Sequence, residues 1–395
     1  MSEWKKCPIG EVVTLRQGFA INAKSKHYMS KEETLLPLLR IADMKNGTKE
    51  VFVKEEIPQR FIAHPEDIIY TRTGNVGLVF RNNYGVMHNN CFSVTPNDAD
   101  ELSRDFLYYA LQNKTFFDTA NALARGAAQP DLPHTSFNSI EFAYPSLFVQ
   151  ERIATILSRY DSLIENYQKQ IKLLEEAAQR LYKEWFIDLH FPGHENTKIV
   201  DGLPEGWERK KVNSIIELQS GFAFKSSTFD DNGAYKIVTI KNVKDGAFDG
   251  DNVSRIVAIP EKMPKHCVLA DGDILLSLTG NVGRVCIVNG KNYLLNQRVA
   301  KLATDYKAFA YCLFRSRDMF IEVNNLANGA AQQNVSPIRI GEMKILLPNN
   351  ELLQEFESIA RKSIARIISL QSQLRLLAEA RDRLLPKLMS GEITV

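Results

Sequence analysis

The sequence predicts an α+β protein with two mixed α/β domains, separated by two long antiparallel coiled-coil helices and related by a pseudo-twofold internal repeat. A duplication is the first observation behind this prediction. Trp4 and Gln168 recur as Trp207 and Gln371, 203 positions later in both cases, in a chain of 395 residues. The second observation is a change from short apolar runs to a heptad pattern late in each half. A repeat this long indicates two copies of one structural unit, and therefore two copies of one surface.

The two copies share several positions but differ in the segments between them. The matched residues are Leu15, Gly18 and Phe19 with Leu218, Gly221 and Phe222, and Leu123 and residues 126–129 with Leu326 and residues 329–332. The offset falls to 199 between Ile41 and Ile240 and rises to 206 between Asp67 and Asp273. Such variation is expected when two copies of a scaffold bind related but different targets, although neutral loop drift would give the same pattern.

Composition narrows the class of protein. Hydrophobic residues make up 44% and charged residues 24% of the chain, and no apolar run reaches the roughly 18 residues that could span a bilayer. The N-terminus lacks the apolar core of a signal peptide. Five scattered cysteines without a Cys-x-x-Cys pair indicate neither a disulfide framework nor a zinc site, so we expect a cytoplasmic protein. A net charge of +2 gives little support to nucleic-acid binding, which would depend on local patches or partners.

Each half begins with short apolar runs that end at turns containing Gly or Asn, a pattern typical of strands. These runs cover residues 12–15, 38–41 and 67–70 in the first half, and residues 215–218, 237–240 and 273–276 in the second. A helical stretch is predicted at residues 106–117 and again at residues 309–320. Both halves therefore have the same order of strands and helix.

A long helix is predicted after each domain, because apolar residues alternate at spacings of four and three. The first pattern contains no Pro or Gly, whereas the second has Ser363 and Arg381 as polar interruptions and is closed by Pro386 and Gly391. Each helix would have roughly 35 residues and would need a partner for its apolar seam. The predicted seam includes Ile153, Leu157, Ile164, Ile171, Leu174, Leu181, Phe356, Ile367, Leu370, Leu374, Leu377 and Leu384.

The predicted boundaries follow from these patterns. The first domain covers residues 1–149, the first spacer helix 150–190, the linker 191–206, the second domain 207–350, and the second spacer helix with its tail 351–395. The linker is polar, rich in turn residues and short, which makes parallel pairing of the helices harder than antiparallel pairing. Antiparallel pairing would place the two domains at opposite ends of a spacer.

Several sequence strings are repeated in a specific order. They are Gly206-Trp207-Glu208 at the start of the second copy, Thr-Gly-Asn-Val-Gly at 73–77 and 279–283, and the helix endings at 181–186 and 385–393. With these strings, the chain resembles the DNA-specificity (S) subunits of Type I restriction-modification systems over essentially its whole length. The resemblance implies that each domain is a target-recognition domain for one half of a bipartite, asymmetric site in double-stranded DNA. It also implies that the helices fix the spacing and hold two methyltransferase (M) subunits, which restriction (R) subunits join, with no membrane involved.

Motifs for catalysis are missing from the sequence. It contains no Asn/Asp-Pro-Pro-aromatic string with a Gly-rich cofactor loop, no phosphate-binding loop and no His-Glu-x-x-His. Short acidic-x-Lys strings such as 342–344 recur by chance in proteins. We therefore expect no catalytic residues, no cofactor and no metal site.

Candidate DNA contacts lie in two pairs of loops. The first pair contributes Thr73, Asn75, Thr279 and Asn281, with Arg72 in the first copy where the second has Leu278. The second pair contributes Arg125 and Gln129 in the first copy, and Asn328, Gln332, Gln333 and Asn334 in the second. Arginine favours the guanine edge and Asn or Gln the adenine edge, so Arg125 opposite Asn328 would suit different half-sites. The alternative is that these loops are only tight turns.

Weaker candidates lie outside these loops. Lys45 and Lys244 could bind phosphate, although a solvated lysine is the common alternative. Arg298 belongs to a further polar set at 296–298, near the position that residues 89–90 occupy in the first copy. The residues Tyr182, Trp185 and Phe186 could either bind a partner or complete a local core. Two other functions stay open: a coiled-coil protein-binding scaffold and a self-sufficient DNA-modifying enzyme.

Overall fold

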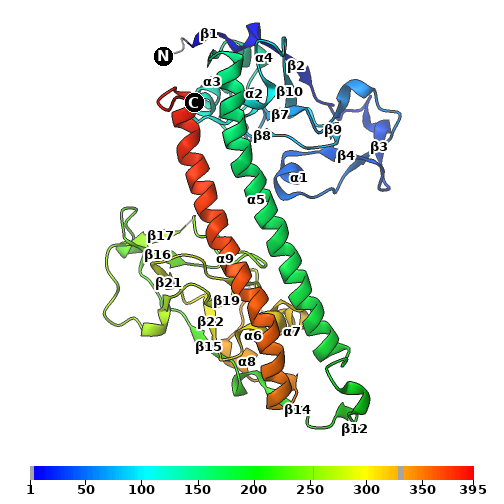
Figure 1. Cartoon of the computed structure of the whole chain (residues 1–395), viewed down its shortest axis with the longest axis vertical. Helices are drawn as coiled ribbons and strands as arrows, with labels where there is room; N and C mark the ends of the chain where they lie inside the picture. The colour runs from blue at the N-terminus through cyan, green and yellow to red at the C-terminus, as the bar shows by residue number, and fades with distance from the viewer. Residues whose placement is uncertain (1–3, 252, 328–332) are drawn as a thin grey trace. The chain divides into compact units, whose positions relative to one another are not determined.

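The computed structural model describes residues 4–251, 253–327 and 333–395, which divide into two compact units. The first unit comprises Met1–Ser162 and Leu377–Val395, and the second comprises Leu163–Leu376. Each unit combines one mixed α/β domain with part of each long helix (Figure 1). The predicted α+β class with an internal repeat is confirmed.

The first domain contains two sheets and a short strand pair. A four-stranded antiparallel sheet has the order β2-β10-β7-β8, a five-stranded sheet has the order β3-β5-β4-β9-β6, and β1 pairs with β11. The strands are β1 (Lys5–Pro8), β2 (Val13–Gln17), β3 (Met29–Ser30), β4 (Leu36–Leu39), β5 (Phe52–Val53), β6 (Ile62–Ala63), β7 (Ile68–Thr71), β8 (Val79–Phe80), β9 (Gly85–Met87), β10 (Cys91–Pro96) and β11 (Glu141–Tyr144).

Three helices pack on the four-stranded sheet through an aromatic core that includes Tyr70, Phe92, Phe106 and Phe137. The helices of this domain are α1 (Ile41–Asn46), α2 (Arg104–Gln112), α3 (Lys114–Leu123) and α4 (His134–Asn138). The single helix predicted at residues 106–117 is wrong in one respect: Asn113 is extended, with ψ 135°, and separates α2 from α3. Ile41, predicted to end a strand, instead begins α1.

The second domain repeats this organisation with the sheet orders β15-β22-β19-β20 and β17-β16-β21-β18 and the pair β14-β23. A turn replaces α1, and Ser316, with ψ 146°, separates α6 from α7 as Asn113 separates α2 from α3. The strands are β14 (Glu208–Lys211), β15 (Glu217–Ser220), β16 (Tyr235–Val238), β17 (Ser254–Ile256), β18 (Val268–Leu269), β19 (Ile274–Ser277), β20 (Val285–Ile287), β21 (Tyr293–Leu295), β22 (Val299–Ala303) and β23 (Lys344–Leu347). The helices are α6 (Lys307–Arg315), α7 (Arg317–Ala327) and α8 (Pro337–Gly341).

The long helices are α5 (Leu147–Tyr182), continued by a π-helical turn at Lys183–Ile187, and α9 (Asn350–Met389). Pro386 lies inside the last turns of α9, so the prediction that it closes the helix is wrong; Gly391, with φ +72°, follows the true end. The segment between α5 and the second domain contains a short hairpin, β12 (Ile199–Val200) with β13 (Leu203–Pro204).

The two long helices pair antiparallel within each unit. In the first unit, Arg381 of α9 contacts Asp161 of α5, and in the second unit Phe356, near the start of α9, packs against Tyr182 and Trp185, near the end of α5. The seam residues that the structure buries are Ile153, Leu157, Phe356, Ile367 and Leu370, and those left half-buried are Ile164, Ile171, Leu174, Leu181, Leu374, Leu377 and Leu384.

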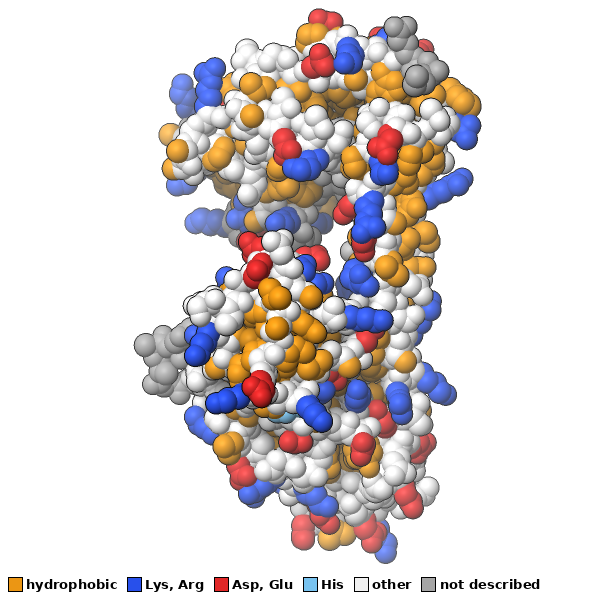
Figure 2. Space-filling model, turned by 90° about the vertical axis from the view of Figure 1, so that its left-hand side faces the viewer, with side chains coloured by type: hydrophobic (Ala, Val, Ile, Leu, Met, Phe, Trp, Pro, Cys, Tyr) orange, Lys and Arg blue, Asp and Glu red, His pale blue; other side chains and the backbone are white. Residues whose placement is uncertain are grey.

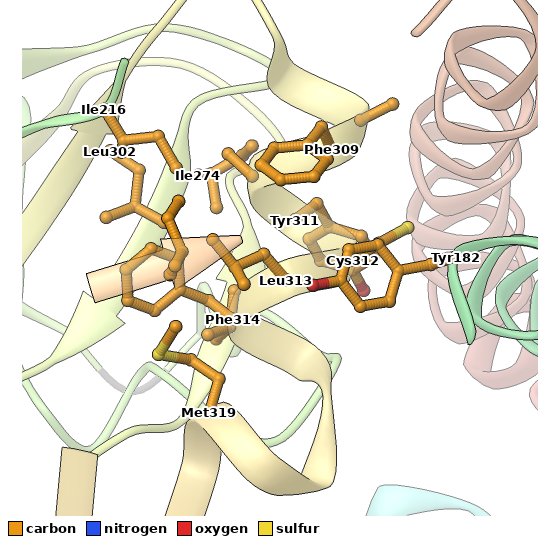
Figure 3. Close-up of a cluster of buried hydrophobic side chains, with 14 of the residues drawn as sticks. Tyr182, Ile216, Ile274, Leu302, Phe309, Tyr311, Cys312, Leu313, Phe314 and Met319 are labelled. Carbon is orange, nitrogen blue, oxygen red and sulfur yellow. The ribbon is translucent and has the colours of Figure 1, made fainter. Parts of the chain in front are cut away.

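The end of α5 is part of the core of the second domain. Tyr182 points towards Tyr311 and Cys312 of α6 (Figure 3), and the side chains of Trp185 and Phe186 are buried in the same cluster. Of the two roles considered for these aromatic residues, the structure supports the local core. Within the described residues, no helix is long and apolar enough to cross a membrane.

Candidate nucleic-acid interface

Three loops of the first domain meet at one end of its four-stranded sheet, where the strands begin and end. Strand β10 is antiparallel to both β2 and β7, with Phe92 opposite Gln17 and Cys91 opposite Thr71. The ends of β2 and β7 therefore lie beside the start of β10. We call the loops at this end of the sheet the loop edge.

Hydrogen bonds join both predicted DNA-contact loops at the loop edge. The backbone nitrogens of Arg72 and Thr73 donate to the carbonyl oxygen of Asn90, at 2.8 and 3.3 Å. Gly74 donates to the carbonyl oxygen of Pro130 at 2.8 Å, so the loop after β7 lies against residues 125–131. The sequence predicted each loop separately, and the structure brings them together.

Arg72 and Thr73 are engaged inside the protein. The Arg72 guanidinium makes two hydrogen bonds to the Asp131 carboxylate, at 3.1 and 2.6 Å, and one to the side-chain oxygen of Gln17 at 3.2 Å. The Thr73 hydroxyl donates to the same carboxylate at 2.5 Å. The hydrogen bonds from Arg72 hold the pKa of the Asp131 carboxyl below its usual value, so this carboxyl is ionised at neutral pH. Their predicted DNA contacts stay a prediction, and the structure adds a role in holding the two loops together.

Other candidates in the first domain are free for a ligand. The side chains of Asn75, Arg125 and Gln129 are exposed and make no hydrogen bond or ion pair with any residue that the structure describes. Gly126, with φ +96°, turns the chain between Arg125 and Gln129. The loop is thus a tight turn that also presents polar side chains, so the two interpretations of it are compatible.

The second domain builds the same edge with the same backbone contacts. Leu278 donates to the carbonyl oxygen of Arg298 at 3.0 Å, and Gly280 donates to that of Gln333 at 2.9 Å. The buried Thr279 hydroxyl donates to the side-chain oxygen of Asn334 at 2.8 Å. Asn281, Gln333 and Arg298 are exposed, and the predicted residues Asn328 and Gln332 lie outside the described residues.

One exchange between the copies is complementary. Leu278 occupies the position of Arg72, and Asn334 occupies the position of Asp131, so the second domain lacks both charges of the pair. The Thr hydroxyl keeps its acceptor in both domains. Sequence reasoning missed Asp131, although its match to Asn334 at the 203-residue offset could have revealed it.

A glycine under the loop edge is required for packing in both copies. A Cβ atom on Gly18 would lie 2.2 Å from the carbonyl oxygen of His88, and one on Gly221 would lie 2.2 Å from that of Asn296. These distances are far below a van der Waals contact. The repeated Gly-Phe strings therefore lie where the segment after β2 or β15 packs closely against the turn before β10 or β22.

The lysine candidates lie on other loops. Lys45 is exposed in the last turn of α1, after β4, and Lys244 is exposed in a turn closed by its backbone bond to Ala247, after β16. Figure 2 shows Lys and Arg side chains interspersed with Asp and Glu over the face that it draws. Binding of DNA phosphate by this face would therefore depend on individual basic residues. Within the described part of the chain, no group of three or more His, Cys, Asp or Glu could hold a metal ion.

A known protein family matches both copies of the repeat. The family model described as the Type I restriction modification DNA specificity domain matches the chain twice, over residues 1–176 and 204–373. The chain belongs to this DNA specificity family. The two matches correspond to the two copies of the repeat, so the resemblance noted from the sequence is confirmed.

Other members of the DNA specificity family align along most of the chain. The MjaVIII specificity subunit of Methanocaldococcus jannaschii is 28% identical over all of this chain and 93% of its own length. The MjaIX specificity subunit of the same organism is 29% identical over 77% of this chain and 72% of its own. The crystal structure of an S subunit from M. genitalium has a TM-score of 0.64 over 98% of this chain and 96% of that one, at 18% identity, which shows a common fold.

Proposed function

We propose that this chain is the DNA-recognition subunit of a Type I restriction-modification complex. In this proposal each domain reads one half of a bipartite, asymmetric site in double-stranded DNA. The observation that carries the proposal is the loop edge: both domains have the same backbone contacts there, whereas the polar side chains differ. A constant scaffold with changed side chains is what two different half-sites require.

The proposal assigns catalysis to other chains. The sequence contains no motif for methyl transfer or nucleotide hydrolysis, and the relatives are named as specificity subunits. We propose two methyltransferase subunits and restriction subunits as partners, with the paired long helices as spacer and docking element. The five cysteines are all free thiols, consistent with the proposed cytoplasmic location.

The test is methylation profiling of DNA exposed to the purified methyltransferase subunits with and without this chain. We expect a bipartite methylated motif only when both are present. If the isolated chain transfers methyl groups from S-adenosylmethionine, it is a self-sufficient enzyme and the proposal is wrong. If the methylated sequences do not depend on the chain, it is a scaffold.

A further inference from the structure

A tight turn lies at the centre of the loop edge in both domains. In the first domain this edge turn covers His88–Cys91, and in the second it covers Asn296–Val299. Its third residue, Asn90 or Arg298, accepts the backbone hydrogen bond from the loop after β7 or β19. Its second residue donates to the carbonyl oxygen of Phe19 or Phe222, at 2.9 and 3.0 Å. The turn is thus tied to both neighbouring loops.

The first side chain of the edge turn fixes its shape in both copies. In the first domain, the backbone nitrogen of Asn90 donates to Nδ1 of His88 at 3.3 Å. In the second, the backbone nitrogen of Arg298 donates to the side-chain oxygen of Asn296 at 3.2 Å. Two different side chains perform the same capping task, so the conformation of the turn is maintained while its sequence changes.

The other two side chains of the turn differ between the copies, and those of Asn89 and Asn90 are half-buried. The second and third positions are Asn89 and Asn90 in the first domain, but Gln297 and Arg298 in the second. The Arg298 side chain is exposed, and its guanidinium makes no hydrogen bond or ion pair with any residue that the structure describes. The planar guanidinium of arginine loses less conformational freedom per hydrogen bond than a lysine ammonium does when it meets a planar hydrogen-bonding partner.

We propose that the edge turn determines sequence specificity: Arg298 reads a guanine in the half-site of the second domain, and Asn90 reads an adenine in the half-site of the first. This inference rests on the proposed function. The chemistry follows from the side chains, because arginine bonds the two acceptors of guanine in the major groove, whereas asparagine matches the donor and acceptor of adenine.

The exchange at the third position favours a base contact over a phosphate contact. Asn and Arg side chains can both donate to phosphate, but two half-sites of different sequence require different side chains only where bases are contacted. Asn90 is neutral, although its backbone occupies the same place as that of Arg298. A position that changes from amide to guanidinium on a constant backbone fits a contact that differs between the half-sites.

The test uses the full chain assembled with its methyltransferase subunits and reads the methylated motif by sequencing. Arg298→Ala should lower the guanine preference at one position of the second half by about tenfold or more, since a bidentate base contact is lost. Arg298→Asn should shift that position towards adenine, and Asn90→Arg should shift one position of the first half towards guanine. The other half should not change in any variant.

Arg209→Ala is the matched control, because Arg209 is an exposed arginine on β14, outside the loop edge. It should leave the motif unchanged. If Arg298→Ala weakens binding to all sequences equally and reduces the salt dependence, Arg298 contacts phosphate and the inference is wrong, while the proposed function stands. If the wild-type complex has no bipartite motif, the proposed function itself fails. Arg298→Ala decides the matter alone if Asn90→Arg does not fold.

Discussion

At the scale of residues, paired substitutions distinguish the two domains. Besides the exchange of Arg72 and Asp131, a second pair has changed: Asp67 binds Arg16 of β2, whereas its counterpart Asp273 binds Lys301 of the neighbouring strand β22. Arg16 and Ser93 are cross-strand partners, as are Gln219 and Lys301. The basic residue is on β2 in the first domain and on β22 in the second, so the carboxylate has an ion-pair partner in both domains.

The second domain suggests the substitutions that test the Arg72–Asp131 pair. Arg72→Leu should destabilise the first domain by about 1 kcal/mol and weaken recognition of its half-site, because Asp131 loses its bidentate partner. Adding Asp131→Asn, which copies the second domain, should recover most of both losses. Chemical unfolding and DNA binding of the single and double variants measure the coupling. Additive losses would show that the pair does not join the two loops.

His88 gives a prediction about pH. Burial lowers the pKa of its imidazole, and the positive charge of Arg40 lowers it further, so the neutral ring caps the edge turn. Because the unfolded chain takes up the proton first, folding stability should fall as the pH drops below about 6.5. His88→Asn, which copies Asn296, should reduce this loss. Unfolding midpoints from pH 8 to pH 5 test the difference, and identical pH profiles for the two proteins would contradict the capping role.

The sequence could predict only part of the interface at this scale. Exposed candidates such as Asn75 and Arg125 follow from turn signals and from the repeat. The repeat could have revealed Asp131 as a candidate, but not its ion pair with Arg72, because such a pair depends on how two loops distant in sequence meet. The edge turn was only a weak candidate, since its offset between copies differs from that of the loops beside it.

At the scale of elements, each domain is fixed to the long helices by a half-buried carboxylate. Asp161 of α5 accepts hydrogen bonds from Tyr109 at 2.6 Å, Arg81 at 3.3 Å and Arg381 of α9 at 2.9 Å. In the second unit, Glu175 of α5 accepts from Tyr311 at 2.6 Å. The two carboxylates are at unrelated positions of the repeat, so the copies have reached similar attachments by different residues.

Asp161→Ala should therefore cost about 2 kcal/mol of stability in the first unit, because it removes the acceptor that Tyr109 and two partly buried arginines share. Asp382→Ala is the matched control: Asp382 also contacts Arg381, but its side chain is 64% exposed, and we expect a loss of less than about 0.5 kcal/mol. Equal losses in the free energy of unfolding would contradict the attachment.

The periodicity of the elements was predictable, but their ends were not. The heptad spacing predicted two helices of the right type and approximate length. The extended residues Asn113 and Ser316 were missed because apolar periodicity continues across each break, while the domain core requires two short helices. Pro386 is tolerated near the end of α9, where its missing backbone donor disturbs only one turn.

At the scale of the whole molecule, the repeat and the fold class could be predicted from the sequence. The recurring offset between the two copies and the spacing of apolar residues in the long helices both extend over long stretches of the chain.

The proposed spacer role of the long helices gives a prediction at this scale. Deleting one heptad from each helix, at residues 163–169 and 366–372, removes about 10 Å and should shorten the gap between half-sites by roughly three base pairs. Both half-sites should stay the same. Methylation profiling measures the gap, and an unchanged gap would contradict the spacer role.

A deletion in only one helix is the control. Loss of one heptad from α9 alone should misalign the antiparallel seam and prevent assembly with the methyltransferase subunits. Size-exclusion chromatography of the complex reports this directly. Normal assembly of the singly deleted chain would mean that the seam does not hold the helices in register.

The proposed function requires two independent recognition domains on one scaffold, and exchange of a single domain tests this requirement most directly. The second domain would be replaced, from β14 to β23, by that of another specificity subunit whose methylated motif has been determined. Sequencing of DNA methylated by the assembled complex should then show a new second half-site, with the first half-site and the gap unchanged. A change in both half-sites, or in neither, would contradict the account.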